Sequence, residues 1–264
     1  MSDTPVRFDR HGSTAVITLD SPAARNALIG PVKEGLAQAI AQVKADPQIR
    51  AVVLTGANGA FCAGGDLRAI AATARLESDG LRARMHGAHA LLRELLTLDR
   101  PVIAAVDGAA YGAGFSLALA ADFVLVTPRA RFCMVFMRMG LVPDCGATYT
   151  LPRIVGAQRA RELFLSAREV DAQESLSLGI AMERHESAEL MPRALALAES
   201  FAAASPLAVS LVKRMALDPG ALEKALEEEA NVQALCFQTT PHRDAVQRFF
   251  DKQPLAFQWP TART

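Results

Sequence analysis

The sequence predicts an α/β fold in residues 1–190, followed by an all-helical region in residues 191–264. Two observations support this division. Short continuous apolar runs, such as residues 51–55 and 102–106, alternate with segments of helical periodicity, as in sheets covered on both faces. The tail has helical periodicity only. With 264 residues, 51% of them hydrophobic, the chain is long enough to bury a large core.

The first elements are a hairpin and a helix. Residues 6–20 predict two strands with a turn at residues 11–13, which contain a glycine. Pro31 opens a helix that carries Leu36, Ile40 and Val43 on one face. The dipeptide at residues 46–47, Asp-Pro, ends this helix.

The following segments alternate between strand and helix. Strands are predicted over residues 51–55, 102–106 and 123–126. Helices are predicted from Asp66 to Gly80, over residues 81–98 and over residues 115–121. In the tail, helix breaks are predicted at residues 205–206, 218–220 and 240–241, each of which contains a proline.

Composition excludes several classes of function. The formal net charge is +0 and no basic stripe occurs, which argues against nucleic acid and membrane surfaces as partners. No apolar run approaches the roughly 18 residues of a membrane span. The four cysteines show no metal-binding spacing, so we expect reduced, mostly buried thiols. We therefore expect a cytoplasmic protein without a metal site.

Two glycine-rich loops are the most informative feature of the chain. Residues 61–67 read Phe-Cys-Ala-Gly-Gly-Asp-Leu, and residues 108–116 read Gly-Ala-Ala-Tyr-Gly-Ala-Gly-Phe-Ser. Each loop follows a predicted strand and opens a helix, where backbone N–H groups have no acceptor within the helix. Two such donors aimed at one point form an oxyanion hole. The loops thus indicate an enzyme that polarises a carbonyl group.

Both loops resemble the signature segments of the crotonase superfamily, the enoyl-CoA hydratase/isomerase family. The resemblance extends to Arg-Asn-Ala-Leu at residues 25–28 and to residues 140–156. It implies a crotonase-like spiral of ββα repeats, followed by C-terminal helices that form a homotrimer or a dimer of trimers. It also implies an acyl-CoA thioester as substrate and no separate cofactor, because coenzyme A enters as part of that substrate.

The resemblance also implies the binding residues. The amides of Ala63 and Ala113 match the donors that hold the thioester oxygen while an enolate forms. The residues that would contact coenzyme A are Arg25, Ala27, Ala63, Gly64, Gly65, Asp66, Leu67, Phe249 and Lys252. The last two, Phe249 and Lys252, would reach the coenzyme of a neighbouring subunit.

The positions of the acid and base decide the reaction. Hydratases of this family use two glutamates, and the matching positions hold Ser116 and Phe136. Adding water requires an acid and a base, so the standard hydratase mechanism is in doubt. Asp144 is the remaining carboxylate. Its residue type and place also fit a helix N-cap. In ring-1,2-epoxyphenylacetyl-CoA isomerase, which this segment resembles, the matching aspartate is the catalytic base. In 4-chlorobenzoyl-CoA dehalogenase it is the nucleophile.

One carboxylate suits a one-base isomerisation of an enoyl-CoA. Asp144 would remove a proton, the oxyanion hole would hold the dienolate, and Asp144 would return the proton two carbons away. We expect His89, Ser116 and Phe136 to line the acyl pocket, although His89 also fits a core histidine on the apolar stripe of its helix. Three alternatives remain: a hydratase, an acyl-CoA or aryl-CoA dehalogenase or hydrolase with Asp144 as nucleophile, and a non-catalytic CoA-binding subunit.

Overall fold

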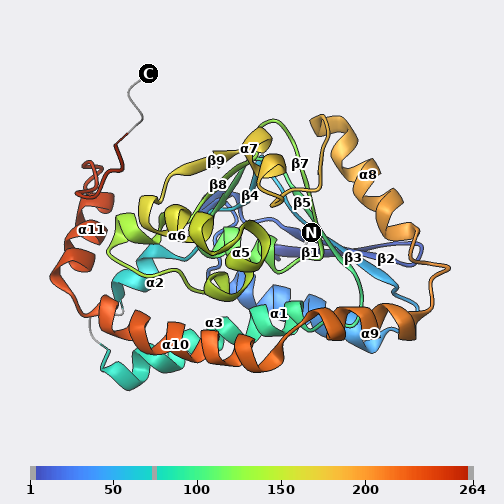
Figure 1. Ribbon diagram of the computed structural model, residues 1–264, viewed down its shortest axis with the longest axis horizontal. Helices are drawn as coiled ribbons and strands as arrows, with labels where there is room; N and C mark the ends of the chain where they lie inside the picture. The colour runs from blue at the N-terminus through green and yellow to red at the C-terminus, as the bar shows by residue number, and fades with distance from the viewer. Residues whose placement is uncertain (1–3, 73–75, 261–264) are drawn as a thin grey trace.

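The computed structural model describes residues 4–72 and 76–260, and it contains two β-sheets packed with helices (Figure 1). The six-stranded sheet has the order β1-β2-β3-β5-β7-β10, and the four-stranded sheet has the order β4-β6-β8-β9. The strands of the larger sheet are β1 (Val6–His11), β2 (Thr14–Leu19), β3 (Ala51–Gly56), β5 (Val102–Val106), β7 (Phe123–Val126) and β10 (Glu183–Arg184). Those of the smaller sheet are β4 (Ala60–Cys62), β6 (Ala109–Tyr111), β8 (Arg131–Cys133) and β9 (Glu169–Asp171).

Successive strands pass from one sheet to the other, which makes the core a spiral of ββα units. β3 continues into β4, β5 into β6 and β7 into β8. The strands of these three units pair in parallel with one another, β3 with β5 and β5 with β7 in one sheet and β4 with β6 and β6 with β8 in the other, whereas β9 pairs antiparallel with β8. Glycines allow the close turns between the layers. A Cβ on Gly56 would lie 2.1 Å from the carbonyl oxygen of Ala60, and one on Gly108 would lie 2.1 Å from that of Gly59. The predicted fold class is confirmed.

Helices cover both faces of the larger sheet (Figure 1). The α-helices are α1 (Gly30–Ala45), α2 (Leu67–Ala72), α3 (Ser78–Leu96), α4 (Ala113–Leu119), α5 (Ala147–Val155), α6 (Ala157–Ser166), α7 (Ala172–Ser177), α8 (Ser187–Glu199), α9 (Pro206–Ala216), α10 (Pro219–Phe237) and α11 (Thr240–Phe250). Leu190, Ala194 and Ala198 of α8 pack on one face of the sheet. The boundary predicted between residues 190 and 191 therefore falls inside a helix that belongs to the core.

Most predicted elements occur where the sequence places them. The hairpin, the helix opened by Pro31 and the three central strands are confirmed. The predicted helix break at Gly80 is wrong, since α3 begins at Ser78 and includes this glycine. The part of that prediction at residues 73–75 lies outside the described residues. The three tail breaks are confirmed as helix starts, where the side chains of Ser205, Asp218 and Thr239 each accept a hydrogen bond from a backbone N–H.

None of the described helices combines the length and hydropathy that a membrane span requires. Likewise, the described part of the chain brings no three His, Cys, Asp or Glu side chains into an arrangement that could hold a metal ion.

Candidate active site

The two glycine-rich loops lie directly against each other. β4 and β6, which lead into them, pair in parallel. A Cβ on Gly64, whose φ is +101°, would lie 2.6 Å from the carbonyl oxygen of Tyr111 and 3.7 Å from the backbone nitrogen of Ala113. A Cβ on Gly114 would lie 2.2 Å from the carbonyl oxygen of Cys62. Glycine is needed at both positions because backbone meets backbone there.

Of the two predicted oxyanion donors, the N–H of Ala113 has no acceptor among the described residues, whereas the N–H of Ala63 has one. Ala113 is the first residue of α4, after Gly112 at the N-cap, so its N–H has no acceptor within the helix. The N–H of Ala63 instead donates to the carbonyl oxygen of Arg25, at 3.1 Å. The prediction that Ala63 supplies a free donor is therefore wrong. Gly65 is exposed, and its N–H makes no hydrogen bond with any residue that the structure describes.

The segment at residues 25–28 holds the first loop in place. Arg25 and Asn26 both have left-handed backbones, with φ of 50° and 59°. The Asn26 amide donates to the carbonyl oxygens of Ala57 and Ala60 and accepts from the N–H of Ser21. This buried asparagine, which the sequence analysis missed, fixes the Arg25 carbonyl that engages Ala63.

The predicted CoA-binding residues lie in two places, at or beside the first glycine-rich loop and near the end of α11. Ala27 is buried, and the Arg25 side chain is exposed beside the first loop. The carboxylate of Asp66 accepts from the N–H of Arg68 at the start of α2. Phe249 and Lys252 are exposed at the end of α11. The role of all these residues in binding coenzyme A stays a prediction.

Asp144 is a buried carboxylate with one free oxygen. Its exposed fraction is 8%. Oδ2 accepts a hydrogen bond of 2.9 Å from Nε2 of Gln233, whereas Oδ1 has no partner within the described chain. Burial raises the pKa of Asp144 to about 6, although the hydrogen bonds from Gln233 and from the Cys145 side chain and the positive charge of Arg84 oppose this rise. Such a carboxylate can accept and return a proton near neutral pH.

The N-cap alternative for Asp144 is wrong. The N-cap of α5 is Gly146, and no side chain caps that helix from the usual position. Instead, the start of α5 is capped by Glu229, which is distant in the sequence and lies in α10. Its carboxylate accepts from the N–H of Gly146 at 2.8 Å and from that of Thr148 at 3.1 Å. The Asp144 side chain thus does not cap α5.

Ser116 and Phe136 are the two residues that the sequence analysis compared with the glutamates of hydratases. The Ser116 hydroxyl, buried in α4, donates to the backbone carbonyl of Asp144 at 2.9 Å. This bond ties the Asp144 segment to the helix that begins with Ala113. Phe136 lies in the 3₁₀ helix η3 (Val135–Met139), and a Cβ on Gly112 would lie 3.7 Å from its ring. Phe136 therefore forms an apolar wall beside the second loop.

His89 is fully buried and faces Glu229 rather than open space. Its exposed fraction is 0%, and its Nε2 lies 3.4 Å from Oε2 of Glu229, which is 2% exposed. Burial lowers the pKa of His89 to about 4 and raises that of Glu229 to about 7. Its full burial fits the alternative of a core histidine, although neither ring nitrogen has a hydrogen-bond partner among the described residues. Its place in an acyl pocket stays a prediction.

The sequence analysis also missed Glu229 and Gln233. Both lie on the buried face of α10, among apolar residues such as Leu226 and Ala230. They are one turn apart, and a polar pair at that spacing on an otherwise apolar stripe was the available signal. Its meaning was hidden because the partners lie far away in the sequence.

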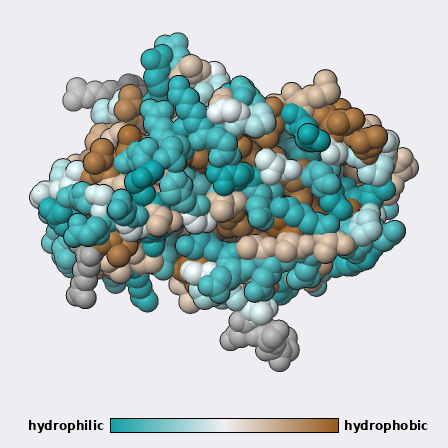
Figure 2. Space-filling model, turned by 90° about the horizontal axis from the view of Figure 1, so that it is seen from below, coloured by the Kyte–Doolittle hydropathy of each residue, from teal (hydrophilic) through white to brown (hydrophobic). Residues whose placement is uncertain are grey.

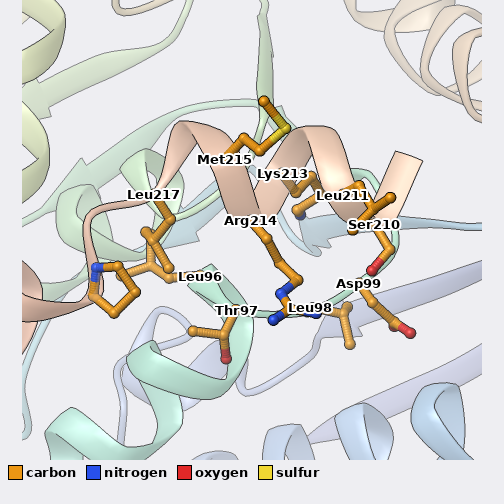
Figure 3. Close-up of a pocket in the computed structure, with 11 residues that line it drawn as sticks. Leu96, Thr97, Leu98, Asp99, Ser210, Leu211, Lys213, Arg214, Met215 and Leu217 are labelled. Carbon is orange, nitrogen blue, oxygen red and sulfur yellow. The ribbon is translucent and has the colours of Figure 1, made fainter. Parts of the chain in front are cut away.

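A pocket elsewhere in the molecule lies between the end of α3 and α9 (Figure 3). Leu96 and Thr97 line one side, and Leu211, Arg214 and Met215 line the other. No residue of the glycine-rich loops or of the Asp144 segment contributes to its lining. This pocket is therefore separate from the candidate active site.

Comparison with known proteins identifies the family. The profile of enoyl-CoA hydratase/isomerase matches residues 9–260 of the chain. The chain belongs to the enoyl-CoA hydratase/isomerase family. It is 36% identical over 260 residues to a Rhodobacter capsulatus protein named "Probable enoyl-CoA hydratase", which covers 97% of this chain and 99% of that protein. It is 38% identical over 211 residues to carnitinyl-CoA dehydratase of Escherichia coli K12, which covers 80% and 79%.

Solved structures of this family share the fold. Enoyl-CoA hydratase/isomerase from Cupriavidus metallidurans CH34 is 39% identical, with a TM-score of 0.78 over 100% of both chains. Enoyl-CoA hydratase from Bacillus halodurans is 28% identical, with a TM-score of 0.86 over 92% of this chain and 99% of that one. The chain is thus an enzyme of the enoyl-CoA hydratase/isomerase family with the crotonase fold.

Proposed function

We propose that this enzyme moves the double bond of a 3-enoyl-CoA to the 2-position, with Asp144 as the only proton carrier. Oδ1 of Asp144 takes a proton from C2, and the bond electrons pass into a dienolate. The same oxygen returns the proton to C4. The observation that carries this proposal is the buried Asp144 carboxylate, whose Oδ1 has no hydrogen-bond partner among the described residues. The backbone carbonyl of Asp144 accepts from the Ser116 hydroxyl, which ties this segment to the helix that begins with Ala113.

The dienolate oxygen would accept hydrogen bonds from two backbone amides. We assign these donors to Ala113 and, in place of Ala63, to Gly65, because the Ala63 N–H is already bonded to Arg25. Removal of one such donor in other enzymes costs about 2.7–4 kcal/mol of transition-state stabilisation. The alanine at 113 is compatible with this role since only its N–H is used.

The acyl-CoA thioester would extend from this site along the first loop. Backbone groups of residues 63–67 would hold the adenine, with Arg25 and Ala27 nearby. Phe249 and Lys252 would contact the coenzyme of a neighbouring subunit in a homotrimer or a dimer of trimers. This chemistry needs no cofactor beyond the substrate's own coenzyme A. We expect the enzyme to act in the cytoplasm.

Exposed apolar side chains support an oligomer. Leu207, Leu211, Val212 and Met215 of α9 are all exposed in the single chain. From below, the molecule shows separate apolar patches among polar side chains (Figure 2). Apolar patches of this kind on a helix are typical of protein–protein contacts.

Solvent deuterium exchange tests the reaction type. Wild type and Asp144→Asn would be incubated in D₂O with a panel of saturated and 3-enoyl-CoA thioesters, and deuterium uptake would be read by mass spectrometry. We expect uptake or double-bond migration in wild type and its loss in Asp144→Asn. No uptake by either protein, with CoA binding intact, would contradict the proposal.

Hydration of a 2-enoyl-CoA is the second candidate, because the relatives cited above are named hydratase and dehydratase. Its test is the loss of thioester ultraviolet absorbance when crotonyl-CoA is mixed with the enzyme. Water addition at a rate above that of double-bond migration would favour hydration over isomerisation.

A further inference from the structure

One face of α10 reaches the segment that carries Asp144. Gln233 contacts Val142 and Asp144, which lie 91 and 89 residues earlier in the chain. One turn before it, Glu229 contacts Gly146 and Thr148. The helix α10 therefore forms hydrogen bonds with the segment both before and after Asp144.

The hydrogen bonds of Gln233 leave its amide a single orientation. Its Oε1 accepts from the N–H of Val142 at 3.1 Å, and its Nε2 donates to the carbonyl oxygen of Val142 at 3.0 Å. A flipped amide would set NH₂ against N–H and oxygen against oxygen. Nε2 must then be the atom that meets Oδ2 of Asp144, at 2.9 Å. Oδ2 is consequently held as an acceptor.

The Glu229 contacts keep the following backbone fixed. Cys145 and Gly146 both have left-handed backbones, with φ of 57° and 76°. The amides of Gly146 and Thr148 at the start of α5 meet the Glu229 carboxylate instead of water. The Asp144 carbonyl is tied on its other side to Ser116. Since the main chain is held at both ends, Gln233 decides which carboxylate oxygen is free.

We propose that Gln233 is a positioning residue that reserves Oδ1 of Asp144 as the oxygen that exchanges protons with substrate. This inference rests on the proposed function of Asp144. When the substrate C–H bond breaks, the O–H bond forms on Oδ1, and Oδ2 keeps accepting from Gln233 throughout. The proton then returns from Oδ1 to carbon, so no oxidant, reductant or further reactant is consumed.

The same bond should govern the pH dependence of the reaction. The charged and titratable groups that act on Asp144 are Arg84 on α3, Glu229 on α10 and the thiol of Cys145, which also forms a hydrogen bond with the Asp144 side chain. The Gln233 donor favours the ionised carboxylate, and the burial of Asp144 disfavours it. Loss of the donor should therefore raise the pH at which the base becomes active.

The test is the pH dependence of kcat and KM for double-bond migration in Gln233→Met and Gln233→Glu. Methionine keeps the length of the side chain but donates no hydrogen bond. We expect the acidic limb of its pH–rate profile, where Asp144 ionises, to move up by about one pH unit, with kcat about tenfold lower and KM nearly unchanged. Glutamate places a second carboxyl beside Asp144, so we expect a larger upward shift.

Two controls separate the possible outcomes. Asn231→Ala removes an exposed amide from the same helix and should leave the pH profile unchanged. Melting temperatures establish that each variant is folded, and Gln233→Glu remains informative if Gln233→Met does not fold. If Asp144→Asn stops the reaction but both Gln233 variants keep the wild-type profile and kcat, the positioning role is refuted. If Asp144→Asn is active, the proposed function itself fails.

Discussion

The two glycine-rich loops and the Asp144 segment differ in the contacts that hold them. The loops meet backbone to backbone, through Gly64 and Gly114. The Asp144 segment is held by side chains from α4 and α10, through Ser116 and Gln233. The first region depends on close approach of the main chain, and the second on partners distant in the sequence. They should therefore fail in different ways when mutated.

The largest expected effect is that of Gly64→Ala on folding. The new Cβ would lie 2.6 Å from the Tyr111 carbonyl at a φ of +101°, so we expect a loss of about 3 kcal/mol or more of unfolding free energy. Urea unfolding measures it. Gly65→Ala is the matched control, because its Cβ would meet only the end of the Ile70 side chain, at 3.2 Å. Equal losses in the two variants would contradict the backbone contact between the loops.

Ala113→Pro should remove one oxyanion donor and leave the fold intact. Proline lacks an N–H, and the first position of a helix such as α4 tolerates it. We expect kcat to fall about 10²- to 10³-fold. Ala113→Gly, which retains the N–H, should keep most of the activity. A folded proline variant with the wild-type kcat would rule out Ala113 as a donor.

Asp144→Asn should gain stability relative to wild type as the pH rises. The folded pKa of about 6 lies above the ordinary 3.8, so the folded wild type loses stability when Asp144 ionises between about pH 4 and pH 7. Asparagine does not ionise. The difference in unfolding free energy should grow by up to about 3 kcal/mol toward pH 8. A difference that stays constant with pH would contradict the burial of an ionisable Asp144.

Arg84→Met should have the smallest effect. The Arg84 charge lowers the pKa of Asp144, after burial and the hydrogen bonds in the order of influence. Its loss should move the acidic limb of the pH–rate profile, where Asp144 ionises, upward by a few tenths of a pH unit, because the charge is partly exposed to solvent. Arg82→Met, which breaks an exposed ion pair with Glu227, should leave the limb in place. A downward shift in Arg84→Met would contradict the electrostatic account.

The difference between the two regions also explains what the sequence could predict. Short-range signals sufficed for the hairpin, the buried strands and the loops, because turn glycines and apolar runs act on their neighbours. These signals did not predict that the N–H of Ala63 donates to the Arg25 carbonyl oxygen. That contact depends on the left-handed turn at residues 25–26.

Longer-range contacts escaped prediction. The periodicity of the tail predicted α10, but not that Glu229 and Gln233 would contact a segment that starts 91 residues earlier. Asp144 was found through its resemblance to related sequences. Its free Oδ1, however, follows from the fixed orientation of the Gln233 amide, which only the folded structure provides.

The most direct test of the central claim is the rate of 3-enoyl-CoA to 2-enoyl-CoA conversion by wild type and Asp144→Asn at pH 8. Asparagine keeps an acceptor for Gln233 but cannot take up a proton, so the account predicts a fall in kcat of about 10²- to 10⁴-fold with CoA affinity preserved. An Asp144→Asn variant that retains kcat within a few-fold of wild type would contradict the assignment of Asp144 as the proton carrier.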